Sequence, residues 1–567
     1  MQELQVRMDE WFFTQGLVGY KKILDNYGFN VRTTYDGLIV EREHLESFPD
    51  AFFTYYLTKY SVAKREEPWL RYLHKQFKEE GDKKAKRDLN QRLNHLKKSA
   101  HRYFKETEEG RLLGEAVDFY RGKKEYSESL DEALDQFIEQ LASKDIDEKL
   151  TSNFFKSVPL KEHYGQPSFL NITHNKKNIE EQKEIFYRDF IYPILQEWDL
   201  FEALENKDEA RVREVLEEAD YRHFNKFRRS FKKKTIDEMQ EYMDEEVFRC
   251  SFTDFPIAFH NFEELIFSPL ALSIDNARNM SWDANQKAFF PLCSLARLLL
   301  FSAHAGATDT REYAVFVTYG GSFDEIYETN QFYESLKARD VTFDQIVFDL
   351  VREQKLKADY LKKRYIIYEY RSDYDSKKTL LDYMIMTPHV MKVFAEDSHL
   401  FYDVHTSVKG EMIRFLLRNI DPKHFITSLL REKIKGNYPA EDVIRLTMIR
   451  HLNEVYKKEV NKVDRSVEKG RVWTLVKSAE AVRKKIGDKK AQGIAYRLLN
   501  AIRSNDKHTF MDTVMRVYIS SELEMPGLLL EALHEDKMDF ATVGNAWVAG
   551  LITDTNYGKD KGENKNE

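Results

Sequence analysis

Residues 221–234 read Tyr-Arg-His-Phe-Asn-Lys-Phe-Arg-Arg-Ser-Phe-Lys-Lys-Lys. Phe224, Phe227 and Phe231 are spaced by three and four positions, which matches one face of an α-helix. The spacing therefore favours an amphipathic helix with the phenylalanines inside and the charges outside. Basic residues that alternate with aromatic ones would also suit contacts to phosphates and bases. Three of these basic side chains are candidate DNA contacts: Lys226, Arg228 and Arg229.

The same helical character extends to most of the chain. The 567 residues include only 22 Gly and 12 Pro, which argues against a turn-rich β architecture. We expect a long polar helical stretch from Trp69 to about Thr107, with Lys83 and Lys84 on a solvated face. From about Thr379 the pattern is helical to the end, with breaks at Pro388, Pro422, Pro439, Gly470, Gly487 and Pro526. Val31 to Val40 alternates like a hairpin, and Tyr313 to Tyr319 reads as a strand.

The length predicts several domains rather than one core. We expect a mixed α/β region over 1–249, an irregular block with short strands over 250–375 and a basic helical bundle over 376–555. The residues 556–567, rich in Gly, Lys, Asn and Glu, have the composition of a disordered tail. The predicted fold class is predominantly α, of the α+β kind, with a mixed N-terminal region and a C-terminal helical bundle.

The charge is divided unevenly along the chain. The formal net charge is −8, yet Val408 to Ser520 contains 25 Lys and Arg and 13 Asp and Glu, a local charge of +12 that leaves −20 elsewhere. Such a division suggests one surface that faces a polyanion. A surface of soluble, lysine-rich helices is the plain alternative.

The sequence shows neither a secretory signal nor an apolar stretch of membrane-spanning length. Two cysteines exclude a disulfide framework, so a reducing cytoplasm is the expected location. We expect no membrane partner.

Common catalytic signatures for phosphate loops, dinucleotide binding, zinc proteases and serine hydrolases do not occur. Two pairs, Arg418/His424 and Arg503/His508, match the loose arginine–spacer–histidine pattern of a helical RNase class. There the arginine would stabilise phosphate charge and the histidine would act as acid or base. The 88 Lys and Arg and 16 His generate such spacings by chance, and Pro422 interrupts the first pair. We expect no enzyme activity.

Cys250-Ser-Phe-Thr253 and Cys293-Ser-Leu-Ala296 each place a cysteine where a Cys-x-x-Cys knuckle could begin. Four thiolates in that arrangement would bind zinc. Thr253 and Ala296 occupy the second positions, so only two thiols remain. Two buried cysteines are the plainer interpretation, and we expect neither metal nor another cofactor.

A series of segments follows in a fixed order between about Trp11 and Leu551: Trp11-Phe-Phe-x-x-Gly-Leu-Val-Gly19, the Cys250 knuckle, Phe267-Ser-Pro-Leu270, Asn276-Ala-Arg-Asn-x-x-Trp282, Pro291-Leu-Cys-Ser-Leu-Ala-Arg-Leu-Leu-Leu300, Tyr319-Gly-Gly-Ser-Phe323, Ala495-Tyr-Arg-Leu-Leu-Asn-Ala-Ile-Arg503, Phe510-Met-Asp-x-x-Met-Arg516 and Gly544-x-Ala-Trp-Val-Ala-Gly-Leu551. This order resembles the CXXC–CXXC family of type I-B CRISPR Cascade large subunits. The chain departs from the family at Thr253 and Ala296, where half the knuckle ligands are missing. Packing of Phe252, Phe255, Leu292 and Leu295 would have to replace the zinc.

The resemblance implies a role without catalysis. Family members join backbone, crRNA-capping and crRNA-processing subunits on a crRNA, recognise a protospacer-adjacent motif in double-stranded target DNA and recruit a helicase-nuclease. The expected phosphate contacts in the basic bundle are Lys484, Lys485, Lys489, Lys490, Arg497 and Arg503. The candidates for reading the motif are Asn175, Lys176, Lys177, Asn276 and Asn279. Residues 175–178 also precede a predicted helix from Glu180, where free backbone N–H groups favour an anion. A stand-alone helical RNase and a scaffold without DNA contacts are the alternatives.

Overall fold

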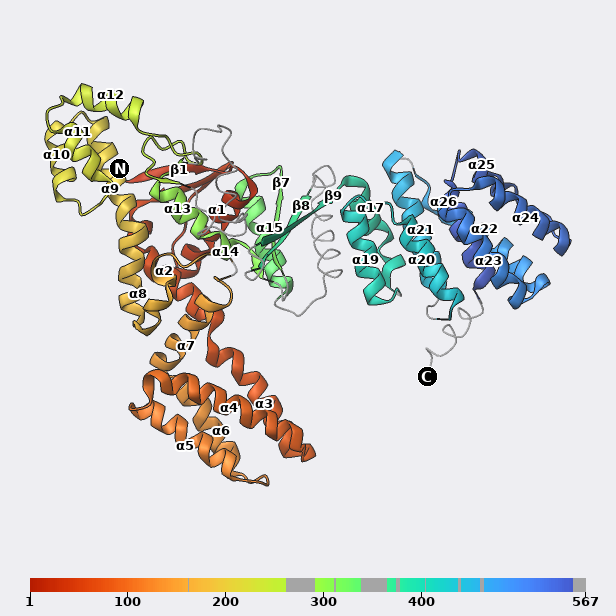
Figure 1. Ribbon diagram of the computed structural model, residues 1–567, viewed down its shortest axis with the longest axis horizontal. Helices are drawn as coiled ribbons and strands as arrows, with labels where there is room; N and C mark the ends of the chain where they lie inside the picture. Colours follow the sequence, from red (N-terminus) through yellow and green to blue (C-terminus); the bar gives the residue numbers. More distant parts are fainter. Residues whose placement is uncertain are drawn as a thin grey trace. The chain divides into compact units, whose positions relative to one another are not determined.

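The computed structural model describes residues 1–161, 163–261, 291–309, 313–337, 365–373, 378–402, 404–436, 440–458 and 463–553, and the statements below concern these residues. They form many helices and a few small sheets (Figure 1), which confirms the predicted predominantly α, α+β class. The chain divides into two compact units. Unit 1 contains residues 1–316, 321–330 and 369–382, and unit 2 contains residues 317–320, 331–368 and 383–567.

Unit 1 begins with a three-stranded antiparallel sheet of order β1-β3-β2. Its first elements are β1 (Glu3–Arg7), α1 (Trp11–Tyr27), β2 (Thr33–Thr34), β3 (Gly37–Glu41) and α2 (Arg42–Tyr60). The pairing of Thr33 with Leu38 and Thr34 with Gly37 confirms the predicted hairpin. The sequence patterns did not predict β1, which pairs with β3 along its whole length. Helix α1 begins at the cap residue Glu10 and packs against α2, α13 and α14.

Five helices of unit 1 build a separate apolar core (Figure 1). They are α3 (Val62–Glu80), α4 (Lys83–Phe104), α5 (Glu108–Gly122), α6 (Ser129–Leu141) and α7 (Lys144–Ser157). The helical stretch predicted from Trp69 to about Thr107 is divided between two of them, α3 and α4. Gly81 adopts a left-handed φ of 64° and ends α3, and the Asp82 carboxylate then caps α4 by accepting a hydrogen bond from Lys84 N.

A further series of elements in unit 1 lies between Ser168 and Asp309. They are the 3-10 helices η1 (Ser168–Leu170) and η2 (Ile172–Lys176), α8 (Ile179–Phe186), the π-helix η3 (Tyr187–Ile191), α9 (Tyr192–Glu205), α10 (Glu209–Glu218), α11 (Phe224–Phe231), α12 (Ile236–Glu246), β4 (His260–Asn261), β5 (Pro291–Leu292), α13 (Ser294–Phe301), α14 (Ala303–Gly306) and β6 (Thr308–Asp309). Phe224, Phe227 and Phe231 are at most 1% exposed, which confirms the amphipathic helix predicted from their spacing.

A second sheet has the strand order β6-β7-β8-β9. The segment that supplies it contains β7 (Ala314–Tyr319), α15 (Phe323–Lys337), β8 (Tyr365–Asp373) and β9 (Lys378–Met386). Strand β7 confirms the strand predicted near Tyr313. Strand β9 shows that the predicted helical pattern from Thr379 was wrong over its first residues, because helices begin only at Pro388.

Unit 2 is a helical bundle built around α26 (Phe540–Ile552), whose residues from Thr542 to Leu551 are all buried. The other elements are α17 (Pro388–Asp397), α18 (His399–Tyr402), α19 (Thr406–Leu417), α20 (Lys423–Ile434), α21 (Ala440–Lys458), α22 (Arg465–Ile486), α23 (Asp488–Arg503), α24 (Lys507–Ser521), η5 (Gly527–Leu530) and α25 (Glu531–His534). Helices α20 to α23 all pack on α26. Gly487 separates α22 from α23 as expected, whereas Gly470 lies inside α22 without breaking it. None of the helices described here has the length and apolarity of a membrane span.

Candidate nucleic-acid interface and cysteine block

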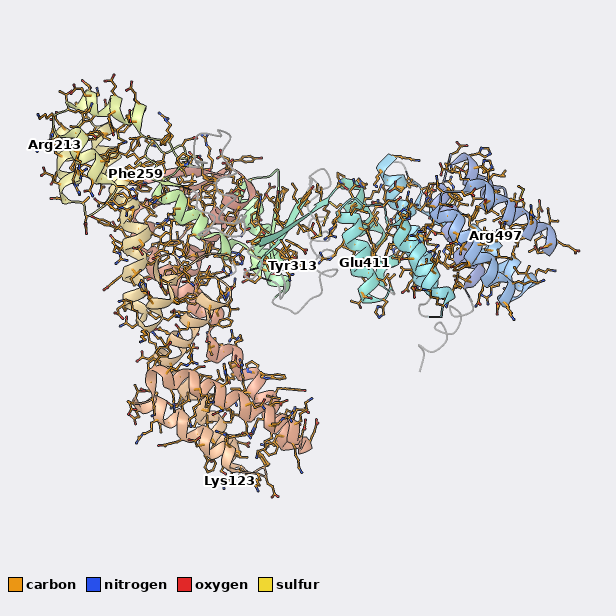
Figure 2. All side chains as sticks on the ribbon, in the orientation of Figure 1. Lys123, Arg213, Phe259, Tyr313, Glu411 and Arg497 are labelled. Atoms are coloured by element: carbon orange, nitrogen blue, oxygen red, sulfur yellow. The ribbon has the colours of Figure 1, made fainter. Side chains whose placement is uncertain are left out.

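A groove between α23 and α24 collects three of the predicted phosphate contacts. Lys489, Lys490 and Arg497 line it, and its volume is about 580 Å³. Helix α24 adds Arg516, which the sequence analysis did not single out. Figure 2 labels Arg497 among the side chains of this bundle. The groove therefore concentrates four positive charges on the surface of unit 2.

The register of α23 explains why these cations face outward together. Its buried residues are Ala491, Ala495, Leu498, Leu499, Ala501 and Ile502. Their spacing of three and four turns one face of the helix to the bundle, so Lys489, Lys490 and Arg497 lie on the exposed face. Gly493 also lines the groove, and a side chain added there would meet no atom within 4 Å.

Most of the predicted cations of this region are not neutralised within the bundle. Lys485, Lys489, Lys490, Arg497 and Arg503 are exposed, and none forms an ion pair with another residue that the structure describes. Two cations beside them form ion pairs: Lys484 with the buried Glu480 at 3.1 Å and Arg516 with the exposed Asp512 at 3.0 Å. The exposed pair of Arg516 and Asp512 contributes little stability, so Arg516 can exchange partners.

Arg503 lines a second cavity of about 390 Å³, between α20 and α23. The other lining residues are His424, Thr427, Ser428 and Arg431. The sequence paired Arg418 with His424 and Arg503 with His508, whereas this cavity brings His424 together with Arg503. Arg418 caps the end of α19, and His508 lies in the first turn of α24. The cavity thus joins one potential acid or base to two guanidinium groups.

The basic residues of α11 divide into two kinds. Arg228 donates hydrogen bonds to the carbonyl oxygens of Leu216 and Ala219 and thereby caps the end of α10. Its guanidinium group is consequently part of the local structure. Lys226 and Arg229 are exposed, and the Lys226 ammonium lies 5.7 Å from the ring centre of Tyr242.

The polar segment before α8 uses its own side chains to cap that helix. Asn178 accepts a hydrogen bond from Glu181 N at 2.8 Å, and Glu181 accepts one from Asn178 N at 2.9 Å. This capping box places a carboxylate where the sequence suggested a bound anion. Lys177 pairs with Glu181 at 3.2 Å. Lys176 is exposed and Asn175 half-buried, while Asn276 and Asn279 lie outside the described residues.

The two half-knuckles meet in space, although 39 residues separate Thr253 from Cys293 in the chain. Cys250 and Cys293 are both buried there, and each thiol affects the pKa of the other. Cys293 Sγ also lies 3.3 Å from Thr253 Oγ1 and accepts a hydrogen bond from Ala296 N at 3.3 Å. The thiol partner lowers the pKa of Cys250 to about 6, and burial raises the pKa of Cys293. A zinc knuckle would have four sulfur ligands, whereas this block has two. The contacts of Cys293 Sγ to Thr253 Oγ1 and Ala296 N lie where further ligands would be.

Backbone pairing and apolar packing hold the cysteine block. Cys250 N donates to Phe255 O at 2.8 Å, and Ser251 N donates to Pro291 O at 2.9 Å. Phe255, Leu292 and Leu295 are at most 3% exposed, and Phe252 stacks on Phe13 with ring centres 4.9 Å apart. These are the four apolar side chains expected to stabilise the block in place of a metal.

A buried carboxylate lies directly beside the cysteines. Glu197 of α9 is 1% exposed and accepts hydrogen bonds from Ser294 N at 2.9 Å, Ser294 Oγ at 2.6 Å and Tyr221 OH at 3.0 Å. Ser294 Oγ also lies 3.1 Å from His260 Nε2. Burial raises the pKa of Glu197 to about 8, although the three hydrogen bonds oppose the shift.

We predict that Glu197 makes the stability of unit 1 depend on pH. Between about pH 4.5 and 8 the Glu197 carboxyl group is ionised in the unfolded chain but protonated in the folded chain. The free energy of unfolding therefore falls as pH rises, by at most about 1.4 kcal/mol per pH unit. Glu197→Gln should remove this slope in urea unfolding measured across that range. Glu205→Gln, an exposed change on the same helix, is the control and should retain it. An unchanged slope in Glu197→Gln would contradict the assignment.

Several residues of these sites carried no signal in the sequence. Arg516 joins the groove only because α24 packs on α23, and Glu197 reaches Ser294 only through the packing of α9 on α13. The exposed Tyr496 beside Arg497 could have been identified, because an aromatic residue next to a cation on a polar helix face suits nucleic-acid stacking.

Comparison of the chain with protein-family models, curated proteins and solved structures found no match. The functional argument therefore depends on the residues and their geometry.

Proposed function

We propose that this chain is the large subunit of a type I-B CRISPR Cascade complex, which binds target DNA through the α23–α24 groove and has no catalytic activity of its own. Its partners in this proposal are the backbone, crRNA-capping and crRNA-processing subunits, the crRNA, double-stranded target DNA and a helicase-nuclease. The observation that carries the proposal is the gathering of Lys489, Lys490, Arg497 and Arg516 along one groove. The pairing of the two half-knuckles supports the family resemblance.

The dimensions of the groove suit a nucleic-acid backbone. Lys489 and Arg497 are eight positions apart on a helix, so their Cα atoms are about 12 Å apart along its axis. That length corresponds to roughly three to four phosphate steps of one strand of duplex DNA. Tyr496, 56% exposed on the same helix, offers a ring on which an unpaired base could stack.

We predict that neutralising the groove weakens DNA binding through its salt-dependent part. In Lys489→Gln/Lys490→Gln/Arg497→Gln, the slope of log affinity against log salt should become shallower by about 3, close to one unit for each lost phosphate contact. The measurement is fluorescence anisotropy with labelled DNA over a salt series, on the full chain and on the complex assembled with crRNA.

The matched control removes three cations from the exposed face of α4, as Lys83→Gln/Lys84→Gln/Arg87→Gln. It changes the net charge equally, so its slope should remain that of the wild type. Equal slopes for the groove variant and the wild type would refute DNA binding at the groove, and equal losses in both variants would indicate a general charge effect.

A second candidate function is RNA cleavage at the cavity of His424, Arg431 and Arg503, because this cavity combines an imidazole with two guanidinium groups. The purified chain would then cleave labelled RNA in the presence of EDTA, and His424→Ala would abolish cleavage. Such a result would replace the non-catalytic proposal. Arg418→Ala and His508→Ala serve as controls, since neither residue lines the cavity.

A further inference from the structure

A buried cluster of two histidines and an aspartate lies in unit 1 and shares no residue with the cysteine block. His163 lies in the turn after α7, His304 on α14 and Asp309 on β6. His163 and His304 are 4% and 1% exposed. One potential metal-ligand atom from each of the three residues lies within 4.8 Å of the other two. The turn after α7 therefore meets the consecutive elements α14 and β6, which lie far from it in the chain.

Two imidazole nitrogens of the cluster lack hydrogen-bond partners. His163 Nδ1 and His304 Nε2 are buried and form no hydrogen bond in the described structure. His304 Nε2 lies 3.3 Å from Asp309 Oδ2, which is close enough for electrostatic attraction. A buried nitrogen without a partner costs about 1–3 kcal/mol. A cation bound by both histidines would give each of these nitrogens a partner.

The residues around the cluster prepare His304 to coordinate a cation. Tyr56 OH lies 2.9 Å from His304 Nδ1. When His304 Nδ1 carries the proton and donates it to Tyr56 OH, Nε2 presents its lone pair toward Asp309. Tyr60 OH donates a hydrogen bond of 2.5 Å to Asp309 Oδ2 and fixes that carboxylate. Contacts of this kind around the ligands are common in metal sites, where they set the tautomer and the ring orientation.

We infer that His163, His304 and Asp309 bind a divalent first-row transition metal ion, with zinc as the best fit. Two imidazoles and one carboxylate are a donor set found in zinc sites and in non-haem iron sites. A tetrahedral zinc ion with bonds of about 2.0 Å holds its ligand atoms about 3.3 Å apart. The distance between His304 Nε2 and Asp309 Oδ2 already has this value. His163 supplies the third potential ligand atom, which lies within 4.8 Å of the other two.

The ion would act as a structural crosslink. It would join α14, β6 and the turn after α7, and through Tyr56 and Tyr60 it would also fix α2. The positive charge of Lys59 helps to lower the pKa of Asp309. A bound metal ion would therefore have to attract the Asp309 carboxylate more strongly than Lys59 does. The inference does not depend on the proposed function, since it concerns different residues.

The experiment measures metal binding by the full chain, purified without a metal-chelating column and then treated with EDTA. Titration with Co²⁺, followed by its visible absorption, should show one equivalent bound per chain, displaced by Zn²⁺. His304→Ala should weaken Co²⁺ binding more than about 100-fold. Tyr56→Phe, which removes a hydrogen bond to a ligand but keeps the ring, should weaken it by about 10–100-fold. Asp309→Asn, of nearly the same shape, covers the case in which His304→Ala does not fold.

The cysteines supply the matched control. Cys250→Ser/Cys293→Ser should leave the affinity for Co²⁺ unchanged, because neither thiol belongs to the cluster. The wild type could instead show a thiolate-to-cobalt charge-transfer band in the near ultraviolet that this double variant loses. The cysteines would then be the metal ligands, and the inference would be overturned. The inference would also be overturned if the wild type bound neither Co²⁺ nor Zn²⁺. The same conclusion would follow if Tyr56→Phe and Asp309→Asn both left the affinity for Co²⁺ unchanged.

Discussion

Gly19→Ala is expected to destabilise unit 1 by about 3 kcal/mol or more. A Cβ atom at Gly19 would overlap Ser302 O and would lie 2.8 Å from Gly306 N. These are backbone atoms at the start and end of α14, so no side-chain rotation relieves the overlap. Helices α1 and α14 would have to separate. The measurement is urea unfolding, combined with hydrogen exchange of peptides from α1 and α14.

The control for this prediction is Gly470→Ala, inside α22. A Cβ atom there meets nothing within 4 Å, so the alanine should stabilise the helix by about 0.5–1 kcal/mol. Opposite signs for two glycine-to-alanine changes in helices would separate close packing from helix propensity. A Gly19→Ala variant as stable as the wild type would contradict the close approach of α1 and α14.

The same approach positions the proposed metal ligand. His304 lies on α14 between Ser302 and Gly306, the residues that contact Gly19. A separation of the helices would move the His304 ring away from Asp309 and from Tyr56. Gly19→Ala should therefore also weaken Co²⁺ binding, although Gly19 lies in a different helix from every ligand.

Local periodicity made part of this fold predictable. The three- and four-residue spacing of Phe224, Phe227 and Phe231 gave both the helix and its buried face, since that spacing follows from the helix itself. Gly81-Asp82 could have been recognised as a helix end followed by an N-cap, which would have divided the predicted helical stretch into α3 and α4. Strand β9 was harder, because Leu380 and Leu381 are adjacent and both exposed, so no alternation marks it.

The candidate sites were predictable only where their residues share one helix. Lys489, Lys490 and Arg497 lie on a single face of α23 and were all candidates because they belong to one basic segment. His163 and the segment with His304 and Asp309 are far apart in the chain, and their proximity is a product of tertiary packing. The same holds for His424 and Arg503, which the arginine–spacer–histidine pattern assigned to two different pairs.

Arg450→Met is expected to cost unit 2 about 3–5 kcal/mol. Arg450 is buried on α21 and contacts two carboxylates. It donates hydrogen bonds of 2.5 and 2.8 Å to Asp421, which lies just before α20. It also donates hydrogen bonds of 2.9 and 3.0 Å to Asp539, the N-cap residue of α26. It also donates to Thr542 Oγ1 at 2.6 Å. Methionine fills a similar volume but leaves two carboxylates close together without a counter-charge.

The pH dependence of this loss identifies its electrostatic origin. Arg450 helps to lower the pKa values of Asp421 and Asp539 in the folded state, against the burial that opposes it. The stabilisation by these carboxylates is therefore present above the ordinary aspartate pKa of about 4 and is lost as pH falls below it. The difference in unfolding free energy between wild type and Arg450→Met should accordingly be largest near neutral pH and shrink in acid.

Lys457→Met, which breaks the surface pair with Glu454 on the same helix, is the control and should change stability by less than about 1 kcal/mol at either pH. A loss in Arg450→Met that stays constant down to acid pH would mean that Arg450 acts through packing, because protonated aspartates no longer need a cation.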